Sequence, residues 1–228
     1  MPSTTIDRRV VLDVETTGLD PARDLLLEVG VVIVDAQLRE IAHHSVLIAS
    51  PAAVQWARNT LAQRDRGEEL DPAQKMHLSN GLIDHLLYPN TFLVEAEGVI
   101  HRERAVSTAA FEAAERLCQF LDDHGISELI PLAGSSVRSL DGPFLAAYTP
   151  ALYRRFNHRT IDASALTELA DFIDPRGGEQ IMSAIPRSGH RTIGDCRRSI
   201  EIIGTFARHY GIGELPAAEK AQDGEAGR

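Results

Sequence analysis

The sequence predicts an α/β fold with a central mixed sheet of five strands, three antiparallel and then two parallel, flanked by helices. Two observations favour this fold. Three consecutive predicted strands near the N-terminus are joined by short links, which is typical of an antiparallel meander. Further along, a clear amphipathic helix precedes a short buried run, and a crossover helix places that run parallel to the first strand.

The length of 228 residues fits one large domain better than two small ones, and the hydrophobic content of 43% is sufficient for a sizeable core. We expect a loose N-terminal lead over residues 1–7 and one large domain over 8–213. Within that domain, the segment of about 51–105 reads as atypical helices and loops. Residues 214–228 are rich in Ala, Glu and Gly and read as a disordered tail.

Charge and composition restrict the function classes. The formal charge of −10 argues against tight, nonspecific binding along a long polyanion, but it permits an acidic pocket that holds cations. No apolar run is long enough to span a membrane, and the N-terminus has no signal-peptide pattern. Cys118 and Cys196 are the two cysteines, which is too few for a disulfide framework and suits a reducing compartment.

The first half of the chain supplies the antiparallel strands. The first is expected over residues 8–15, and Asp13 and Glu15 share one of its faces because side chains two apart point the same way. The second, over 25–34, is almost continuously apolar, as in a strand covered on both faces. The third is expected over 40–49. Helices are predicted over 55–69 and 81–87.

The second half supplies the helices and the parallel strands. An amphipathic helix is predicted over 108–124, with Ser107 or Thr108 as N-cap and Gly125 as C-cap. A buried strand follows over 129–133, then a loop over 134–141 that enters a helix. The last strand is predicted over 160–164, continuing as a helix over 165–172. Residues 174–179 read as a loop, and 188–195 lead into a final helix.

Each acidic motif has an ordinary explanation when taken alone. Asp13 and Glu15 fit an edge strand with one solvated face, and Asp141 fits a turn or an N-cap. Asp195 fits a capping box that begins at Thr192, and His190 fits a solvated loop. Neighbouring carboxylates nevertheless repel each other, and a hard divalent cation would relieve that repulsion. We interpret a further acid, Asp162 in an apolar strand, as a hydrogen-bonded support residue.

Four blocks, in this order, resemble the DEDDh 3′–5′ exonucleases, which have a ribonuclease-H-like fold, and most closely oligoribonuclease. They are LDVETTGLDPARD, GSSVRSLDGPFLAAYTPAL, RTIDASALTELA and HRTIGDCRRSIE, and the resemblance covers most of 8–210 in element order. Each motif is weak alone, whereas their shared order and spacing are specific.

The resemblance implies four acids, Asp13, Glu15, Asp141 and Asp195, that are catalytic and bind two divalent ions, Mg²⁺ or Mn²⁺. Two such ions about 3.5–4 Å apart can activate a water and stabilise the leaving oxygen of a phosphodiester. By the same resemblance Asp13 bridges both ions, Glu15 and Asp195 hold the ion that binds the attacking water, and Asp141 helps to position the second. His190 is the implied general base, since imidazole titrates near neutral pH.

The resemblance also implies substrate contacts. Thr17 would contact the 3′-terminal nucleotide and Leu19 would wedge against a base; the alternatives are a strand-end polar residue and a core leucine. Ser135 stands where oligoribonucleases usually have asparagine. The chain departs from the family pattern at two places. Pro72 replaces an aromatic residue on which a base could stack, which affects the expected preference for dinucleotides. Residues 157–159 read Asn-His-Arg in place of the family's His-Tyr-Arg.

The leading hypothesis is a homodimeric, cytoplasmic exoribonuclease that degrades short single-stranded RNA to nucleoside 5′-monophosphates. One alternative is a 3′–5′ exodeoxyribonuclease of the proofreading or repair type. Another is a non-catalytic nucleic-acid-binding protein on the same fold, which the presence of all five site residues disfavours.

Overall fold

A computed structural model describes residues 8–88, 95–96, 99–100, 110–127 and 129–213. Its centre is a five-stranded sheet in the order β3-β2-β1-β6-β7. The β1–β2 and β2–β3 pairs are antiparallel, and the β1–β6 and β6–β7 pairs are parallel. The predicted mixed sheet, three antiparallel strands followed by two parallel ones, is therefore confirmed. The strands are β1 (Arg9–Thr16), β2 (Leu26–Val34), β3 (Glu40–Leu47), β6 (Ile130–Gly134) and β7 (Phe156–Asp162).

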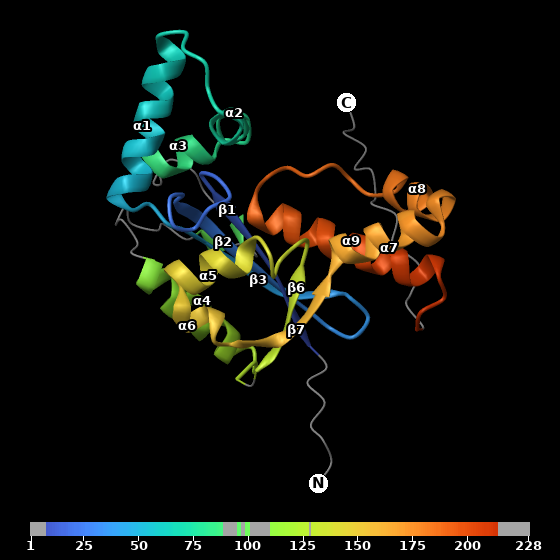
Figure 1. Cartoon of the computed structure of the whole chain (residues 1–228). Helices are drawn as coiled ribbons and strands as arrows, with labels where there is room; N and C mark the ends of the chain where they lie inside the picture. The colour runs from blue at the N-terminus through green and yellow to red at the C-terminus, as the bar shows by residue number, and fades with distance from the viewer. Residues whose placement is uncertain (1–7, 89–94, 97–98, 101–109, 128, 214–228) are drawn as a thin grey trace, which may run out of the picture.

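Two groups of helices cover the two faces of the sheet. The first comprises α4 (Ala110–Asp123), α5 (Asp141–Tyr148) and α6 (Pro150–Tyr153); the second comprises α7 (Ala163–Ile173), α8 (Pro175–Ser183) and α9 (Thr192–His209). Figure 1 shows the first group at the lower left and the second at the right. Val10 and Leu12 of β1 belong to the core that contains α4, whereas Val11 packs in a second core with Cys196 of α9. The alternation along β1 therefore directs Asp13 and Glu15 to the face covered by α9.

A third helical group lies beside the end of β1. It contains α1 (Pro51–Asp65), α2 (Pro72–Ser79) and α3 (Leu82–Leu87) and stands at the upper left in Figure 1. A small core of its own joins it to the sheet, because Ala53, Ala57 and Ile83 pack with Leu27 of β2. This group occupies part of the segment predicted as atypical, and the short pair β4 (Glu95–Ala96) and β5 (Val99–Ile100) follows it.

Several predicted boundaries were wrong, each for a local reason. The helix predicted over 55–69 is α1, which begins at Pro51 because the Ser50 side chain accepts a hydrogen bond from the Ala53 N–H. Helix α2 had no specific prediction, although Asp71 and Gln74 form a capping box at its start. Residues 174–179, predicted as a loop, contain the Asp174 cap and the first turns of α8. The two consecutive glycines in this segment have low helix propensity, so the sequence did not predict a helix there.

The last strand also begins earlier than predicted. It is β7, over Phe156–Asp162 instead of 160–164, and the following helix begins at Ala163. Gly125 adopts a positive φ of 72° after α4, as expected of a C-cap. The predicted N-cap at Ser107 or Thr108, the lead over 1–7 and the tail over 214–228 lie outside the described residues.

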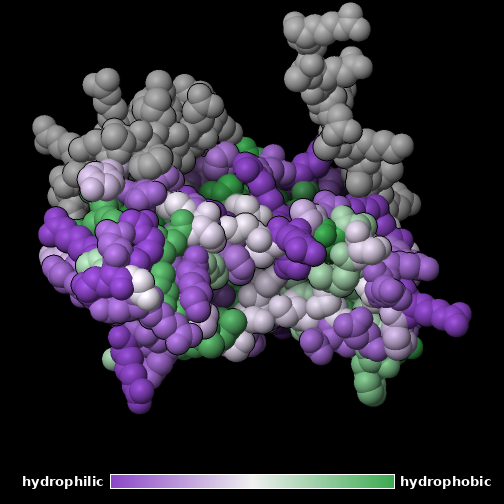
Figure 2. Space-filling view, turned by 90° about the horizontal axis from the view of Figure 1, so that it is seen from above, coloured by the Kyte–Doolittle hydropathy of each residue, from purple (hydrophilic) through white to green (hydrophobic). Residues whose placement is uncertain are grey.

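On the face seen in Figure 2, hydrophilic residues dominate and hydrophobic residues form separate patches among them. Within the described ranges, no helix has the length and apolar character required to cross a membrane.

Candidate active site

The register between β1 and β2 brings acidic side chains together at one end of the sheet. Glu15 lies directly opposite Glu28, and Asp13 lies opposite Gly30. The register shifts between Glu15 and Thr16, where β1 ends. One carboxylate oxygen each of Asp13, Glu15 and Asp195 lies within 4.8 Å of the others. Two residues of one strand and one of a distant helix therefore converge as the sequence predicted.

Asp141, the fourth predicted acid, reaches the same place from α5. Its Oδ1 accepts a hydrogen bond of 2.9 Å from the Val14 N–H, between Asp13 and Glu15. Asp141 is buried, and it is the first residue of α5, not its N-cap. The turn or N-cap interpretation of Asp141 is therefore wrong, because this carboxylate connects α5 to the strand that carries the other acids.

Asp195 reaches the cluster because α9 approaches β2 very closely. A Cβ added at Gly30 would lie 2.4 Å from Thr192 Oγ1 and 2.5 Å from Thr192 Cβ, so only glycine permits this contact. The capping-box interpretation is wrong, since the N-cap residue of α9 is Arg191 and not Thr192, and no side-chain capping hydrogen bond forms there. Asp195 Oδ2 instead accepts a hydrogen bond of 2.8 Å from the Ser188 hydroxyl.

Burial and mutual repulsion raise the pKa values of these acids. Burial, followed by the charges of Asp141, Glu15 and Asp195, raises the pKa of Asp13 well above its usual range. Burial and the opposing Glu28 raise the pKa of Glu15 to about 8, although the Arg191 guanidinium lowers it in part. Burial raises the pKa of Asp141 to about 7, against the lowering effect of the Val14 hydrogen bond. A cation between these groups would remove much of that repulsion.

The residues present fit a divalent metal ion. Asp195 Oδ1 is buried and has no hydrogen-bond partner among the described residues, and buried carboxylate oxygens normally have one. Together with the nearby oxygens of Asp13 and Glu15, it forms an all-oxygen donor set of the type that Mg²⁺ and Mn²⁺ prefer.

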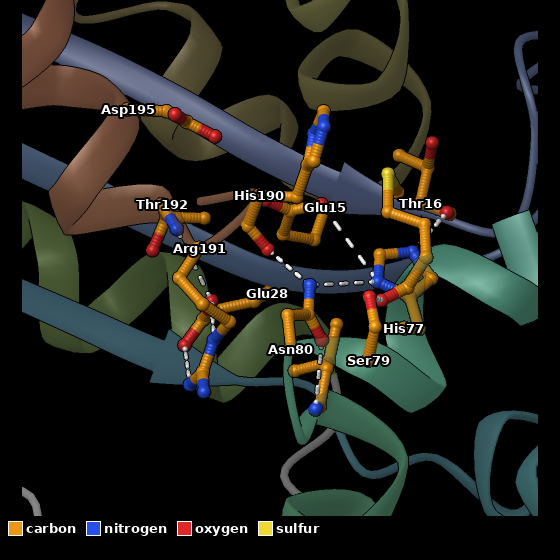
Figure 3. Close-up of polar contacts among 12 residues, drawn as sticks. Glu15, Thr16, Glu28, His77, Ser79, Asn80, His190, Arg191, Thr192 and Asp195 are labelled. Carbon is orange, nitrogen blue, oxygen red and sulfur yellow. Dashed lines mark hydrogen bonds and ion pairs between the residues drawn. The ribbon is translucent and has the colours of Figure 1, made fainter. Parts of the chain in front are cut away.

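His190 lies on the loop before α9, as predicted. It is exposed and has a φ of +52°, a left-handed conformation uncommon for a side chain other than glycine. Its N–H donates to the Ser188 hydroxyl at 3.1 Å, and that hydroxyl donates in turn to Asp195. In Figure 3 the His190 ring lies on the opposite side of the loop from Asn80.

Four further polar residues surround this loop. Glu28 is buried and accepts two hydrogen bonds from the Arg191 guanidinium, at 2.9 and 3.1 Å. His77 is fully buried, with Nε2 at 2.9 Å from the Thr16 carbonyl and Nδ1 at 3.9 Å from Glu15. Asn80 donates to the His190 carbonyl (Figure 3). Sequence reasoning missed these roles, although an acid inside the apolar run of β2 was a signal for Glu28.

The predicted substrate residues differ in how they are held. The Thr17 hydroxyl accepts a hydrogen bond from the Leu25 N–H at 2.9 Å and so stabilises the turn after β1. Leu19 is 78% exposed, which excludes the core alternative. The hydroxyls of Ser135 and Ser199 share a hydrogen bond of 2.8 Å, which connects β6 to α9. Asp162 accepts hydrogen bonds from the N–H groups of Ser136 and Ser164, as expected of a support residue.

Comparison with known proteins identifies curated relatives across nearly the whole chain. An oligoribonuclease from Azoarcus sp. is 32% identical over 200 residues, which cover 87% of this chain and 90% of that relative. An oligoribonuclease from Neisseria meningitidis serogroup A is 28% identical over 208 residues, which cover 91% of this chain and 94% of the relative. No protein-family model matches the chain.

Solved structures show the same fold. Exonuclease I of E. coli in complex with a dT13 oligonucleotide superposes with a TM-score of 0.54 at 14% identity, over 90% of this chain and 42% of that chain. Exonuclease I from Methylocaldum szegediense gives a TM-score of 0.52 at 16% identity. The chain thus spans about two fifths of the length of exonuclease I. Together, the fold, the four converging carboxylates and the identity to curated relatives show that the chain belongs to the oligoribonuclease family, whose members are DEDDh 3′–5′ exonucleases with a ribonuclease-H-like fold.

Proposed function

We propose that this protein is a 3′–5′ exoribonuclease that uses two divalent metal ions to release nucleoside 5′-monophosphates from short single-stranded RNA. The convergence of Asp13, Glu15 and Asp195 within 4.8 Å, with Asp141 bound to the backbone between the first two, carries this proposal. By the resemblance of the four sequence blocks, these positions correspond to the four acids of the family.

The proposed mechanism assigns a role to each of these side chains. Asp13, Glu15 and Asp195 would hold one ion, and Asp13 with Asp141 would hold the second. When bound, the ions supply positive charge that activates water and stabilises the leaving oxygen. The His190 imidazole accepts the proton of the attacking water, because it is exposed on the loop before α9 and its ring makes no hydrogen bond within the described residues. Thr17, Leu19 and Ser135 are the proposed substrate contacts.

Short RNA is the proposed substrate because the curated relatives are named oligoribonuclease. The test is digestion of matched RNA and DNA oligomers of two to about twenty nucleotides with Mg²⁺ or Mn²⁺. We expect RNA to be shortened faster, with nucleoside 5′-monophosphates as products. Equal or faster cleavage of DNA would favour the exodeoxyribonuclease alternative, and binding without cleavage would favour the non-catalytic one.

A homodimer is the proposed assembly, and an apolar surface on α7 supports it. Leu169, Phe172 and Ile173 lie three and four positions apart on this helix, so they share one face, and Phe172 is 86% exposed. Hydrophobic residues protrude at the lower right of Figure 2, on the side where Figure 1 places α7 to α9. Clustered exposed apolar side chains of this kind are typical of protein–protein contacts.

The remaining assignments follow from the same proposal. Residues 8–213 would form the exonuclease domain, and 214–228 would be a tail outside it. A cytoplasmic location is proposed because both cysteines are free thiols, one half-buried and one buried. Fluorescence microscopy of the tagged full chain tests the location, and limited proteolysis tests the domain limits.

A further inference from the structure

The peptide that carries His190 is held from three directions. Its N–H donates to the Ser188 hydroxyl, and its carbonyl accepts a hydrogen bond from the Asn80 side chain. On its C-terminal side, Arg191 makes an ion pair with the buried Glu28 of β2. Figure 3 shows the contacts of Asn80 and Glu28 on one side of the loop and the imidazole on the other. The backbone is thus fixed while the ring remains accessible.

This restraint matters because His190 has a φ of +52°. A left-handed conformation is unfavourable for a residue other than glycine, and it persists only where surrounding contacts enforce it. Histidine tolerates such a conformation better than bulky or β-branched residues, but it is not favoured there. If the contact to the carbonyl is lost, the peptide can relax and the ring direction changes with it.

Asn80 is itself held rigidly and is well placed to enforce this conformation. Its Oδ1 accepts a hydrogen bond of 2.9 Å from the Leu82 N–H at the start of α3, which orients Nδ2 toward His190. It is the C-cap residue of α2, and its N–H donates to the Met76 carbonyl. In the same helix, His77 contacts the Thr16 carbonyl at 2.9 Å. A continuous set of contacts therefore connects the end of β1, which carries Glu15, to the peptide of His190.

We propose that Asn80 is a positioning residue for His190, so that helices α2 and α3 are part of the machinery that orients the general base. This inference rests on the proposed function, in which His190 accepts the proton of the attacking water. Asn80 contacts none of the clustered acids directly. Its one indirect route to them runs through His77, whose Nδ1 lies 3.5 Å from Asn80 Nδ2 and 3.9 Å from Glu15, and the double variant in the His190→Ala background distinguishes that route from an effect through His190.

The substitution Asn80→Asp removes the donor and adds a negative charge, so it is compared with Asn80→Ala, which removes the donor and adds no charge. Aspartate keeps the oxygen that caps Leu82 but presents no N–H to the His190 carbonyl. We expect kcat on a short RNA oligomer to fall about 10- to 100-fold, since a displacement of about 1 Å can cost that much, with KM changed by less than about twofold. Asn80→Ala removes all three side-chain contacts, to the His190 carbonyl, the Leu82 N–H and His77, and must show the same loss of kcat. If one variant does not fold, the other decides.

Asn157→Asp is the matched control. Asn157 also caps a backbone N–H with Oδ1, that of Arg159 at 2.8 Å, and donates Nδ2 to a distant carbonyl, that of Leu129 at 3.3 Å. It lies near the start of β7, whereas Asp162 at the end of that strand borders the site. We expect this control to retain the wild-type kcat. That result would show that an asparagine-to-aspartate change with the loss of one hydrogen bond elsewhere in the fold does not by itself lower the rate, and Asn80→Ala excludes an effect of the added charge.

Two further measurements distinguish positioning from simple destabilisation. In the His190→Ala background, Asn80→Asp should change the residual rate by less than about twofold, because residues that act as a unit are not additive. Comparison of wild type with His190→Ala assigns the imidazole NMR signals of His190, because those signals are missing from the variant. We expect the assigned signals to shift in Asn80→Asp. If His190→Ala is slow but Asn80→Asp is fully active, this inference is wrong and the proposed function stands. The same conclusion follows if the losses of rate in the two single variants add up in the double variant. A His190→Ala enzyme as active as wild type overturns the proposed function as well.

Discussion

In the absence of divalent ions, the stability of this protein should fall as pH rises from about 5.5 to about 8. The perturbation acts on Glu15, whose pKa is raised from an ordinary value of 4.5 to about 8 by burial and by Glu28. Over this interval the unfolded carboxyl is ionised and the folded one is protonated. The folded state therefore binds more protons, and the free energy of unfolding decreases with each unit of pH.

The size of the effect follows from the two pKa values. Each pH unit costs about 1.4 kcal/mol while the folded group stays protonated, and the cost diminishes near pH 8. Integrated from about pH 5.5 to about pH 8, Glu15 alone contributes a loss of about 3 kcal/mol. For a chain of this length that corresponds to roughly 6–12 °C in Tm. Asp141, whose pKa is raised to about 7, adds in the same direction.

Thermal unfolding in EDTA, followed by circular dichroism at both pH values, measures this effect. Glu15→Gln is the informative variant, because it keeps the shape and removes the titration, so it should gain stability over wild type as pH rises. Burial lowers the pKa of His77, so protonation of this residue destabilises the folded state as pH falls below about 6.5. Both proteins contain His77, so the difference in stability between wild type and Glu15→Gln at each pH removes this contribution. Addition of Mn²⁺ at pH 8 should restore the thermal stability of the wild-type protein but should not raise that of Glu15→Gln. A gap between the two proteins that stays constant with pH would refute this reasoning.

Three further outcomes are expected. Asp195→Asn should lower cleavage at least about 100-fold and weaken Mn²⁺ binding in calorimetry, since it removes a charge from the donor set; unchanged binding would exclude Asp195 as a ligand. Gly30→Ala should also reduce cleavage, because its Cβ would overlap Thr192, whereas Gly194→Ala, with open space around it, should not; equal rates would contradict the close-approach argument. Phe172→Glu should give a monomer in analytical ultracentrifugation, and a persistent dimer would place the interface elsewhere.

The sheet and the positions of the acids could be predicted from the sequence because their signals are local or ordered. The apolar run of β2 and the two carboxylates on one face of β1 follow from strand periodicity, and the order of the four motifs identifies the family. Asp13 and Glu15 needed only a correct strand assignment. Asp141 and Asp195 needed the resemblance, since each alone fits a helix start.

The contacts that fix the loop before α9 could not be predicted in this way. Asn80 and His190 are 110 positions apart, and their contact depends on the angle at which α2 meets the end of β1. Helix α8 escaped prediction for a different reason, because its capping signal at Asp174 precedes two glycines that disfavour a helix. Long-range polar contacts and weak helices are both decided by tertiary packing, which periodicity does not report.

The arrangement of the strands explains why α9 is the critical element of the site. The parallel strands β1, β6 and β7 end at the same edge of the sheet, so Glu15 and the segments leading to Asp141 and Asp162 meet there by topology. Asp195 has no such constraint, since it comes from a helix that crosses the face of the sheet. Its position depends on how closely α9 can approach β2, and the Gly30–Thr192 contact sets that distance. A single methyl group at Gly30 should therefore disturb the metal-binding set while leaving the sheet intact.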